Sequence, residues 1–292
     1  MKFAKALSNH MPKQFSLKKH LHEHMGGFEK ARPITMLHAS ELTKTPEFCP
    51  RAYALMESYE VTPPAQYVET SLRYTYDMGR MLEQSLRESW AGDITVGDWN
   101  CGGCGKTYEF QFRPHKCSCG AKQFKYRELR FTSVPTGASG GMDLLVRLPG
   151  YQKATLVEAK SMEKDAWADL KAPLAEHRLR TNLYLRLIEE SDNPNKKFIM
   201  LDRAIILYMV KGFGKKDPEL SKLGIKEGFS PFKEYVISRD DSQTDALMAR
   251  AKQWNQWKLG TGLLPDPICL SRDEYRACKC PVVQQCFLED VA

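Results

Sequence analysis

The chain has 292 residues, of which 42% are hydrophobic, and a formal net charge of +7. This length suits one large domain with insertions or two domains, and the apolar fraction is sufficient for a buried core. The positive charge favours an anionic partner. The sequence contains no run of 18 apolar residues, which excludes a membrane-spanning helix, and its first residues lack the apolar stretch of a signal peptide.

The nine cysteines form an odd count and cluster as Cys-Gly-Gly-Cys, Cys-Ser-Cys and Cys-Lys-Cys. Such clusters are typical of metal sites in a reducing compartment rather than of a disulfide framework. We therefore expect a cytoplasmic protein that binds metal.

Residues 1–33 are basic and contain four of the seven histidines, His10, His20, His22 and His24. Their spacing fits no recurring ligand pattern, so we expect a solvated arm that contacts phosphates. Residues 34–292 are then expected to form one domain.

Two short helices follow, one capped by Ser40 and one with Pro50 at its first position. Cys49 therefore lies at a helix start, where it is either a ligand or core filling. A longer helix is predicted over residues 66–90 and includes Glu83, which by itself would be an exposed acid. Its inner face is predicted to consist of Met78, Met81, Leu82, Ser85 and Leu86.

Residues 99–124 read as an insertion that holds two pairs of cysteines. Cys101 and Cys104 are separated by two glycines, and Cys117 and Cys119 follow after twelve further residues. This spacing predicts a zinc ribbon with four thiolate ligands, in which residues 108–112 form a strand. The second pair is one residue shorter than usual, which leaves His115 as a reserve ligand.

Two apolar runs, residues 142–148 and 153–160, are separated by Pro149-Gly150-Tyr151-Gln152, a loop typical of a hairpin. If Leu148 pairs with Lys153, Asp143 lies opposite Glu158. Because side chains alternate along a strand, Asp143, Glu158 and Lys160 then share one face. Two carboxylates on adjacent strands can bind a divalent cation, and a nearby lysine can position water or stabilise negative charge. The opposite face, predicted as core, contains Met142, Leu144, Val146, Val157 and Ala159.

Before the hairpin, a strand is predicted over residues 126–134. After it, helices are predicted over 167–171, 174–190 and 240–259. Further strands are expected over 203–210 and 232–238. Arg180 and Tyr184 lie one turn apart on the second of these helices, where they either contact a phosphate or form a surface stack. Near the C-terminus, Cys278, Cys280 and Cys286 form a group with no fourth neighbouring thiol unless Cys269 serves.

Together these motifs, in this order, resemble the iron–sulfur branch of the RecB-like PD-(D/E)XK nucleases, which includes the AddB nuclease domain and the CRISPR-associated type-four exonucleases. The matching stretch is 37–288, with residues 99–124 inserted. The chain departs from that pattern in three places. Glu83 stands where many members have histidine, Arg180 where they have glutamine, and one residue rather than two separates Cys278 from Cys280.

The resemblance implies an α/β restriction-endonuclease-like fold, with a mixed central sheet flanked by helices. It further implies a metal-dependent DNA nuclease, an exonuclease on single strands or free ends, acting in recombination, repair or processing with recombination or replication partners. Asp143, Glu158, Glu83 and the Ala159 carbonyl would bind Mg²⁺ or Mn²⁺, and Lys160 would position the water. Arg180 and Tyr184 would bind the strand. A [4Fe–4S] cluster would be bound by Cys49, Cys278, Cys280 and Cys286, with Zn²⁺ as the alternative metal.

The alternative function belongs to another class. The protein would then bind nucleic acid through the same fold and ribbon without cleaving it.

Overall fold

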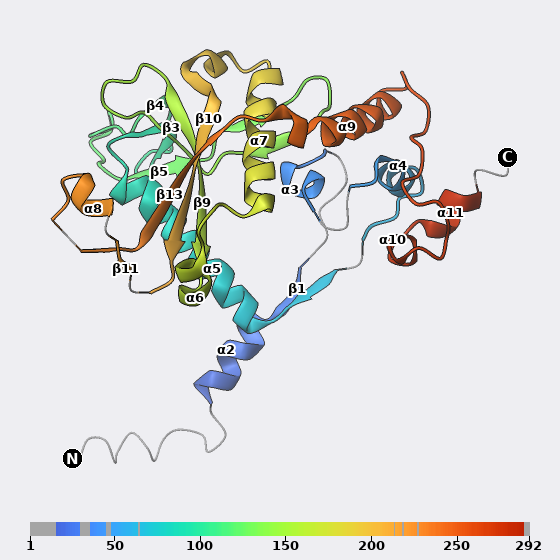
Figure 1. Ribbon diagram of the computed structural model, residues 1–292, viewed down its shortest axis with the longest axis horizontal. Helices are drawn as coiled ribbons and strands as arrows, with labels where there is room; N and C mark the ends of the chain where they lie inside the picture. The colour runs from blue at the N-terminus through green and yellow to red at the C-terminus, as the bar shows by residue number, and fades with distance from the viewer. Residues whose placement is uncertain are drawn as a thin grey trace. The chain divides into compact units, whose positions relative to one another are not determined.

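The computed structural model describes residues 16–29, 36–44, 48–63, 65–212, 214–217, 219–226 and 228–288, except for the side chains of 215 and 219. Internal contacts divide the chain into two compact units (Figure 1). The first comprises residues 1–32 and 63–78, and the second comprises residues 33–62 and 79–292. No helix among the described residues is long and apolar enough to cross a membrane.

In the first unit, helix α2 (Leu17–Met25) is followed by strand β1 (Gly27–Glu29), which pairs antiparallel with β2 (Gln66–Val68). Ser16 caps α2 by accepting a hydrogen bond from the Lys19 amide. None of the α2 residues is buried, including His20, His22 and His24, whereas His10 lies outside the described residues. Because residues 66–68 pair as a strand, the helix predicted over 66–90 begins only at Thr70, as α5 (Thr70–Ser85).

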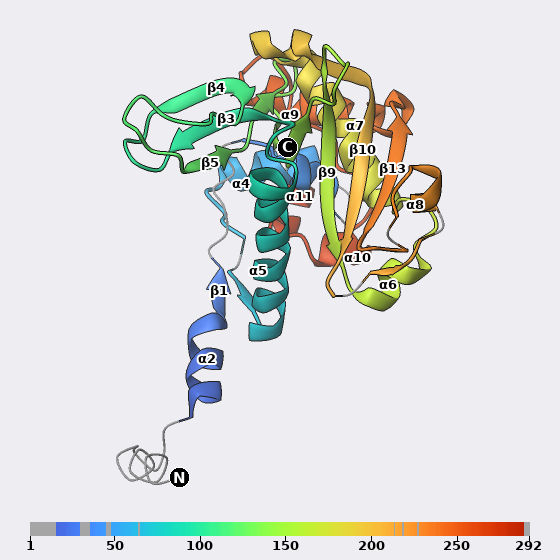
Figure 2. The same cartoon turned by 90° about the vertical axis from the view of Figure 1, so that its left-hand side faces the viewer.

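The second unit contains a mixed sheet with the strand order β13-β10-β9-β8-β3-β4, in which β5 also pairs with β3 (Figure 2). The β9 and β10 strands run parallel, and the other pairs are antiparallel. This confirms the predicted mixed α/β architecture. The strands are β3 (Thr95–Cys101), β4 (Thr107–Phe112), β5 (Phe124–Arg127), β8 (Leu144–Val146), β9 (Ala154–Met162), β10 (Ile199–Val210) and β13 (Phe232–Ser238).

Shorter strands lie outside this sheet. The strand predicted over 126–134 is two strands, because β5 pairs with β3 whereas β6 (Arg130–Thr132) pairs with β7 (Ser139–Gly141). A third small pair is β11 (Lys215–Lys216) with β12 (Phe229–Ser230).

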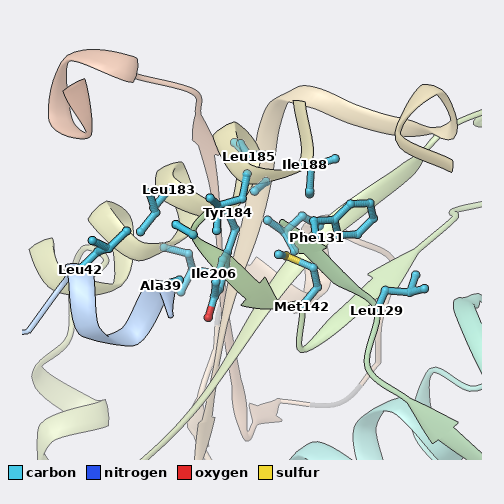
Figure 3. Packing of buried hydrophobic residues seen from close by; sticks show 14 of the residues in the cluster. Ala39, Leu42, Leu129, Phe131, Met142, Leu183, Tyr184, Leu185, Ile188 and Ile206 are labelled. Atoms are coloured by element: carbon cyan, nitrogen blue, oxygen red, sulfur yellow. The ribbon is translucent and has the colours of Figure 1, made fainter. Parts of the chain in front are cut away.

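Helix α7 (Ala175–Glu190) covers one face of the sheet and confirms the helix predicted over 174–190. Its apolar side chains meet those of the sheet in the main core, where Leu183, Tyr184 and Ile188 pack near Phe131 and Ile206 (Figure 3). Helix α9 (Asp245–Lys258) adds Trp254 to the same core. The remaining helices are α3 (Ala39–Leu42), α4 (Pro50–Ser58), α6 (Lys164–Asp169), α8 (Glu219–Lys222), α10 (Tyr275–Cys278), α11 (Val283–Leu288), and the 3₁₀ turns Pro194–Phe198 and Asp241–Gln243.

The hairpin of β8 and β9 has the predicted register, since Leu144 pairs with Val157 and Val146 with Thr155. Two expectations about which face a side chain occupies are wrong, although Met142 is buried as predicted. Met142 packs in the main core below α7 rather than with Leu144 in the smaller core on the other face, because the chain has not yet entered β8 at residue 142. Met81 is 62% exposed, because α5 turns its Gly79 and Leu82 side inward, in line with Leu86 just beyond its end.

Candidate functional site

The carboxylates of Asp143 and Glu158 meet at the start of the hairpin, as its register requires. The Asp143 carboxylate accepts a hydrogen bond from the Ala159 amide at 2.9 Å. The Lys160 ammonium lies 2.6 Å from Glu158 Oε1 and 3.7 Å from Asp143 Oδ2. The N–H and C=O of one strand residue point to the same edge, so the Ala159 carbonyl also faces Asp143. The structure thus brings together these four predicted residues.

Glu158 is only 1% exposed, although it is a carboxylate. Among the described residues, its oxygens have no hydrogen-bond partner apart from the Lys160 ammonium. Burial raises the pKa of Glu158, and the negative charge of Asp143 raises it further. Burial alone would lower the pKa of Lys160, but its ion pairs with Glu158 and Asp143 outweigh this effect and raise it. A buried carboxylate is stable only when paired or bound to a metal, so this donor set fits a cation.

Helix α5 brings a third carboxylate towards this pair. Gly79 is buried, and a Cβ at this position would lie 3.0 Å from the Ser161 hydroxyl on β9. The absence of a side chain therefore lets the helix approach the strand closely, one turn before Glu83. Burial raises the pKa of Glu83 to about 7, with a further contribution from Asp143. The three carboxylates do not all lie within 4.8 Å of one another, so binding one ion together would require their side chains to move.

The residues after α5 form a π-helix, Leu86–Trp90, in which the Ala91 amide donates to the Leu86 carbonyl. Its Arg87 donates hydrogen bonds to the Glu128 carboxylate at 3.1 Å and to the Asp143 carbonyl at 3.3 Å. Arg87 thereby fixes the backbone of a site residue, a role that the sequence analysis missed. The i, i+4 spacing of Glu83 and Arg87 was the available signal.

Helix α7 faces the site with Arg180, whose charge influences the pKa values of Glu158 and Lys160. Its guanidinium also lies 3.4 Å from the Thr43 hydroxyl. Tyr184 is 8% exposed and packs in the core, where a Cβ on Gly140 would lie 2.8 Å from its ring. Gly140 therefore lets the chain before β8 approach α7 closely. One turn before Arg180 lies His177, a further residue that the sequence analysis did not identify.

His177 hydrogen-bonds through Nδ1 to the Tyr208 hydroxyl at 2.9 Å. The same hydroxyl accepts a hydrogen bond from the Leu174 amide, so it is free to donate its proton to His177. Burial lowers the pKa of His177 to about 4, and the charges of Lys160 and Arg180 add to this effect. His177 is therefore a neutral imidazole at pH 7, beside two cations.

A hollow of about 890 Å³ lies elsewhere and contains none of these site residues. Its walls include Trp90, Trp167, Leu223, Phe232 and Lys233. The candidate site is thus defined by buried charge rather than by the size of a cavity.

The four cysteines of the insertion form a second candidate site. The sulfur atoms of Cys101, Cys104, Cys117 and Cys119 all lie within 4.8 Å of one another, as ligands of one metal ion must. Two are buried and two are exposed. The Tyr108 hydroxyl donates to Cys117 at 3.2 Å, which lowers the pKa of that thiol to about 5. These four cysteines could therefore hold a metal ion, whereas the predicted reserve ligand His115 is not a member of the group.

We call residues 95–127, which comprise β3, β4, β5 and their connections, the cysteine ribbon. Its inner face packs Trp99, Phe124 and the two buried cysteines together. Phe110 adopts a left-handed backbone with φ 42°, where the pairing of β3 and β4 shifts register. The Asp98 carboxylate stabilises this bulge by accepting from the Phe110 amide at 3.1 Å. The ribbon is therefore an extension of the main sheet rather than a separate domain.

A third group of cysteines lies around α4, α10 and α11, which are neighbours in Figure 1. Cys49 caps α4 by accepting from the Ala52 amide at 3.4 Å, and it packs with Cys280 and Cys286 in one small apolar cluster. Burial raises the pKa of Cys280, and the charges of Cys49, Cys286 and Cys269 raise it further. The fourth thiol near this group is therefore Cys269.

Cys278, which the sequence suggests as a cluster ligand, lies in a different environment from the other cysteines of this group. It is exposed, and its thiol donates to the Arg272 carbonyl at 3.5 Å. It lies at the end of α10, whereas Cys280 and Cys286 pack in the apolar cluster with Cys49. The buried Arg51 connects the two ends of the chain here by donating to the carbonyls of Pro265 and Cys286.

The comparisons with known proteins identify no relative of this chain. No protein-family model matches the sequence, and no curated protein is significantly similar to it.

Proposed function

We propose that the protein is a metal-dependent DNA nuclease with a PD-(D/E)XK site on a restriction-endonuclease-like sheet. The observation that supports this proposal best is the buried Glu158 carboxylate, which faces Asp143 across the hairpin and pairs with Lys160. An ordinary surface salt bridge would not require a buried carboxylate without other partners. A catalytic metal ion would neutralise this buried negative charge.

Asp143, Glu158 and the Ala159 carbonyl would hold Mg²⁺ or Mn²⁺, and Glu83 would complete the site by a change of side-chain rotamer. The ion would activate water and neutralise charge on the phosphate during hydrolysis. The Lys160 ammonium contacts both carboxylates. With a cation held by these carboxylates, Lys160 would be free to orient the attacking water and donate hydrogen bonds to the phosphate.

The surrounding residues would place the substrate. Arg180 on α7 provides a planar cation suited to a phosphodiester. Arg87 holds the Asp143 backbone, so the carboxylate keeps its direction while the substrate exchanges. Tyr184 is buried beneath this surface and would support Arg180 rather than contact the strand through its whole ring.

The cysteines would bind two further cofactors. The close spacing of the ribbon sulfurs suits one structural Zn²⁺. The wider group of Cys49, Cys269, Cys280 and Cys286 suits a [4Fe–4S] cluster, since each thiolate there binds a different iron. Both cofactors require reduced thiols, which agrees with the expected cytoplasmic location.

The test is a nuclease assay with Mn²⁺ on labelled single-stranded and duplex DNA. Asp143→Asn and Glu158→Gln should each lower the rate by about 100-fold or more, because each removes a metal ligand. The matched control is Asp202→Asn, which removes an exposed carboxylate of the same sheet that pairs only with its neighbour Arg203. An Asp143→Asn protein as active as the control would refute the proposed site. DNA binding without cleavage in the parent would instead support the non-catalytic alternative.

A further inference from the structure

The face of the sheet that holds the carboxylates can be followed into the cysteine ribbon through the strand registers. Leu145 of β8 pairs with Leu156 of β9 and with Val96 of β3, so these three side chains share one face. Alternate residues of a strand point the same way. Asp143, two places before Leu145, and Asp98, two places after Val96, therefore belong to that face as well.

β8 pairs with the first residues of β3, and β5 pairs with residues 98–101 along the same edge. Asp98 pairs with Arg127 and Asn100 pairs with Lys125. Arg127 and Lys125 consequently lie on the same face of the sheet as Asp143 and Glu158, with Arg127 nearer to the hairpin. The opposite face of β5 contributes buried side chains to the ribbon core.

The ribbon is strongly basic on its exposed side. Residues 95–127 contain six lysines and arginines and two acids, Glu109 and the buried Asp98. Lys122 and Lys125 are exposed, and Arg127 remains half exposed although it pairs with Asp98. Alternate residues of a strand lie about 7 Å apart, which is about twice the rise per nucleotide of a DNA strand. The cations of β5 are therefore spaced to meet every second phosphate of such a strand.

We propose that the cysteine ribbon is a DNA-binding surface that guides the substrate strand to and from the carboxylate site, along Arg127, Lys125 and Lys122. This inference rests on the proposed function, because the path of the strand is defined by the metal site at which it would be cleaved. The contacts are with phosphates, so binding is independent of sequence. The π-helix connects this surface with the site, since Glu88 accepts from the Tyr126 amide at 3.1 Å while Arg87 contacts Asp143.

The experiment compares the double variant Lys122→Ala/Lys125→Ala with Lys252→Ala/Lys279→Ala. Both remove two exposed lysines, but the second pair lies on α9 and beyond α10, away from β3, β4 and β5 (Figure 1). Binding to a labelled strand of about 30 nucleotides is measured without added Mg²⁺ or Mn²⁺, at several salt concentrations. Two lost phosphate contacts should weaken binding about tenfold and lower the salt slope by roughly 1.4 to 1.8. Zinc content and melting temperature should match those of the parent.

Cleavage in Mn²⁺ provides the second measurement. The ribbon variant should show a higher KM on the long strand with an unchanged kcat. On a strand of about four nucleotides, too short to leave the site and reach the ribbon, it should match the parent. Equal affinity and equal salt slope for the two double variants would overturn the ribbon surface. Because binding is measured without added Mg²⁺ or Mn²⁺, that result is distinct from a failure of the nuclease proposal, which depends on Asp143→Asn.

Discussion

At the scale of single residues, Glu158 determines how the protein should respond to pH. Its carboxyl group is 1% exposed, and burial raises its pKa above the ordinary value near 4.5. Glu83, raised to about 7, responds in the same direction. In the unfolded chain both groups lose their protons near pH 4.5. Between that pH and about 7, the folded protein therefore binds more protons than the unfolded chain.

His177 opposes this difference, because its pKa is lowered to about 4 and the unfolded chain therefore binds its proton up to about pH 6.5. The two carboxyl groups outweigh it, so the metal-free protein should lose stability as pH rises from 5 to 8, by about 2 kcal/mol. Glu158→Gln should flatten the curve, because the amide stays neutral throughout. Added Mn²⁺ should stabilise the protein more at pH 8 than at pH 5, since only the ionised carboxylates bind it. Urea unfolding across this pH range measures all three effects. A variant with the same pH slope as the parent would show that the Glu158 carboxyl group ionises freely in the folded protein.

At the scale of elements, the cysteine ribbon and the hairpin share one sheet through β3, which pairs with β4, β5 and β8. The ribbon has only a small core of its own around Trp99, so a metal ion bound by its four cysteines would supply much of its local order. The hydrogen bond from the Phe110 amide to Asp98 connects the bulge of β4 to β3, so disorder in the ribbon would extend to β3.

Elemental analysis should find about one zinc per chain bound at the ribbon. Cys101→Ser should lose this zinc and increase amide hydrogen exchange across residues 99–124, while the metal at the distant cysteine group stays bound. The control is Cys278→Ser, which changes an exposed cysteine outside the ribbon and should retain the zinc. If Cys101→Ser kept its zinc in full, the ligand set would have to be sought elsewhere.

At the scale of the whole molecule, the third cysteine group joins segments from the two ends of the second unit. Cys49 lies at the start of α4, whereas Cys280 and Cys286 lie near the end of the described chain. A cluster bound there would close a very long loop, and its binding free energy would stabilise the folded state. The hydrogen bonds of Arg51 to Pro265 and Cys286 already join these segments without metal.

Protein prepared without oxygen should be brown and hold about four irons per chain. Cys49→Ser and Cys269→Ser should each bleach the colour and lower the melting temperature by roughly 10 °C. Cys278→Ser should leave both unchanged, because its exposed thiol points to the Arg272 carbonyl. Bleaching by Cys278→Ser with retention of colour in Cys269→Ser would restore the ligand set first expected from the sequence.

Local patterns in the sequence were sufficient for the hairpin and the ribbon cysteines. Alternation and loop length alone predict that Asp143 faces Glu158, because both features act within about 20 residues of chain. The two cysteine pairs converge for the same reason, since the turn after each first cysteine is built from its neighbours. The mixed sheet and helix α7 also followed from the pattern of apolar residues.

Only the tertiary structure decided which side chains join these local units. Arg87 and His177 reach the site through helices whose rotation depends on packing against β9 and the core. Cys269 lies close enough to Cys49 for their charges to interact, and the hydrogen bond of Arg51 on α4 to Pro265 holds this part of the chain. Spacing along the chain cannot predict such encounters, since they depend on which surfaces the whole fold buries.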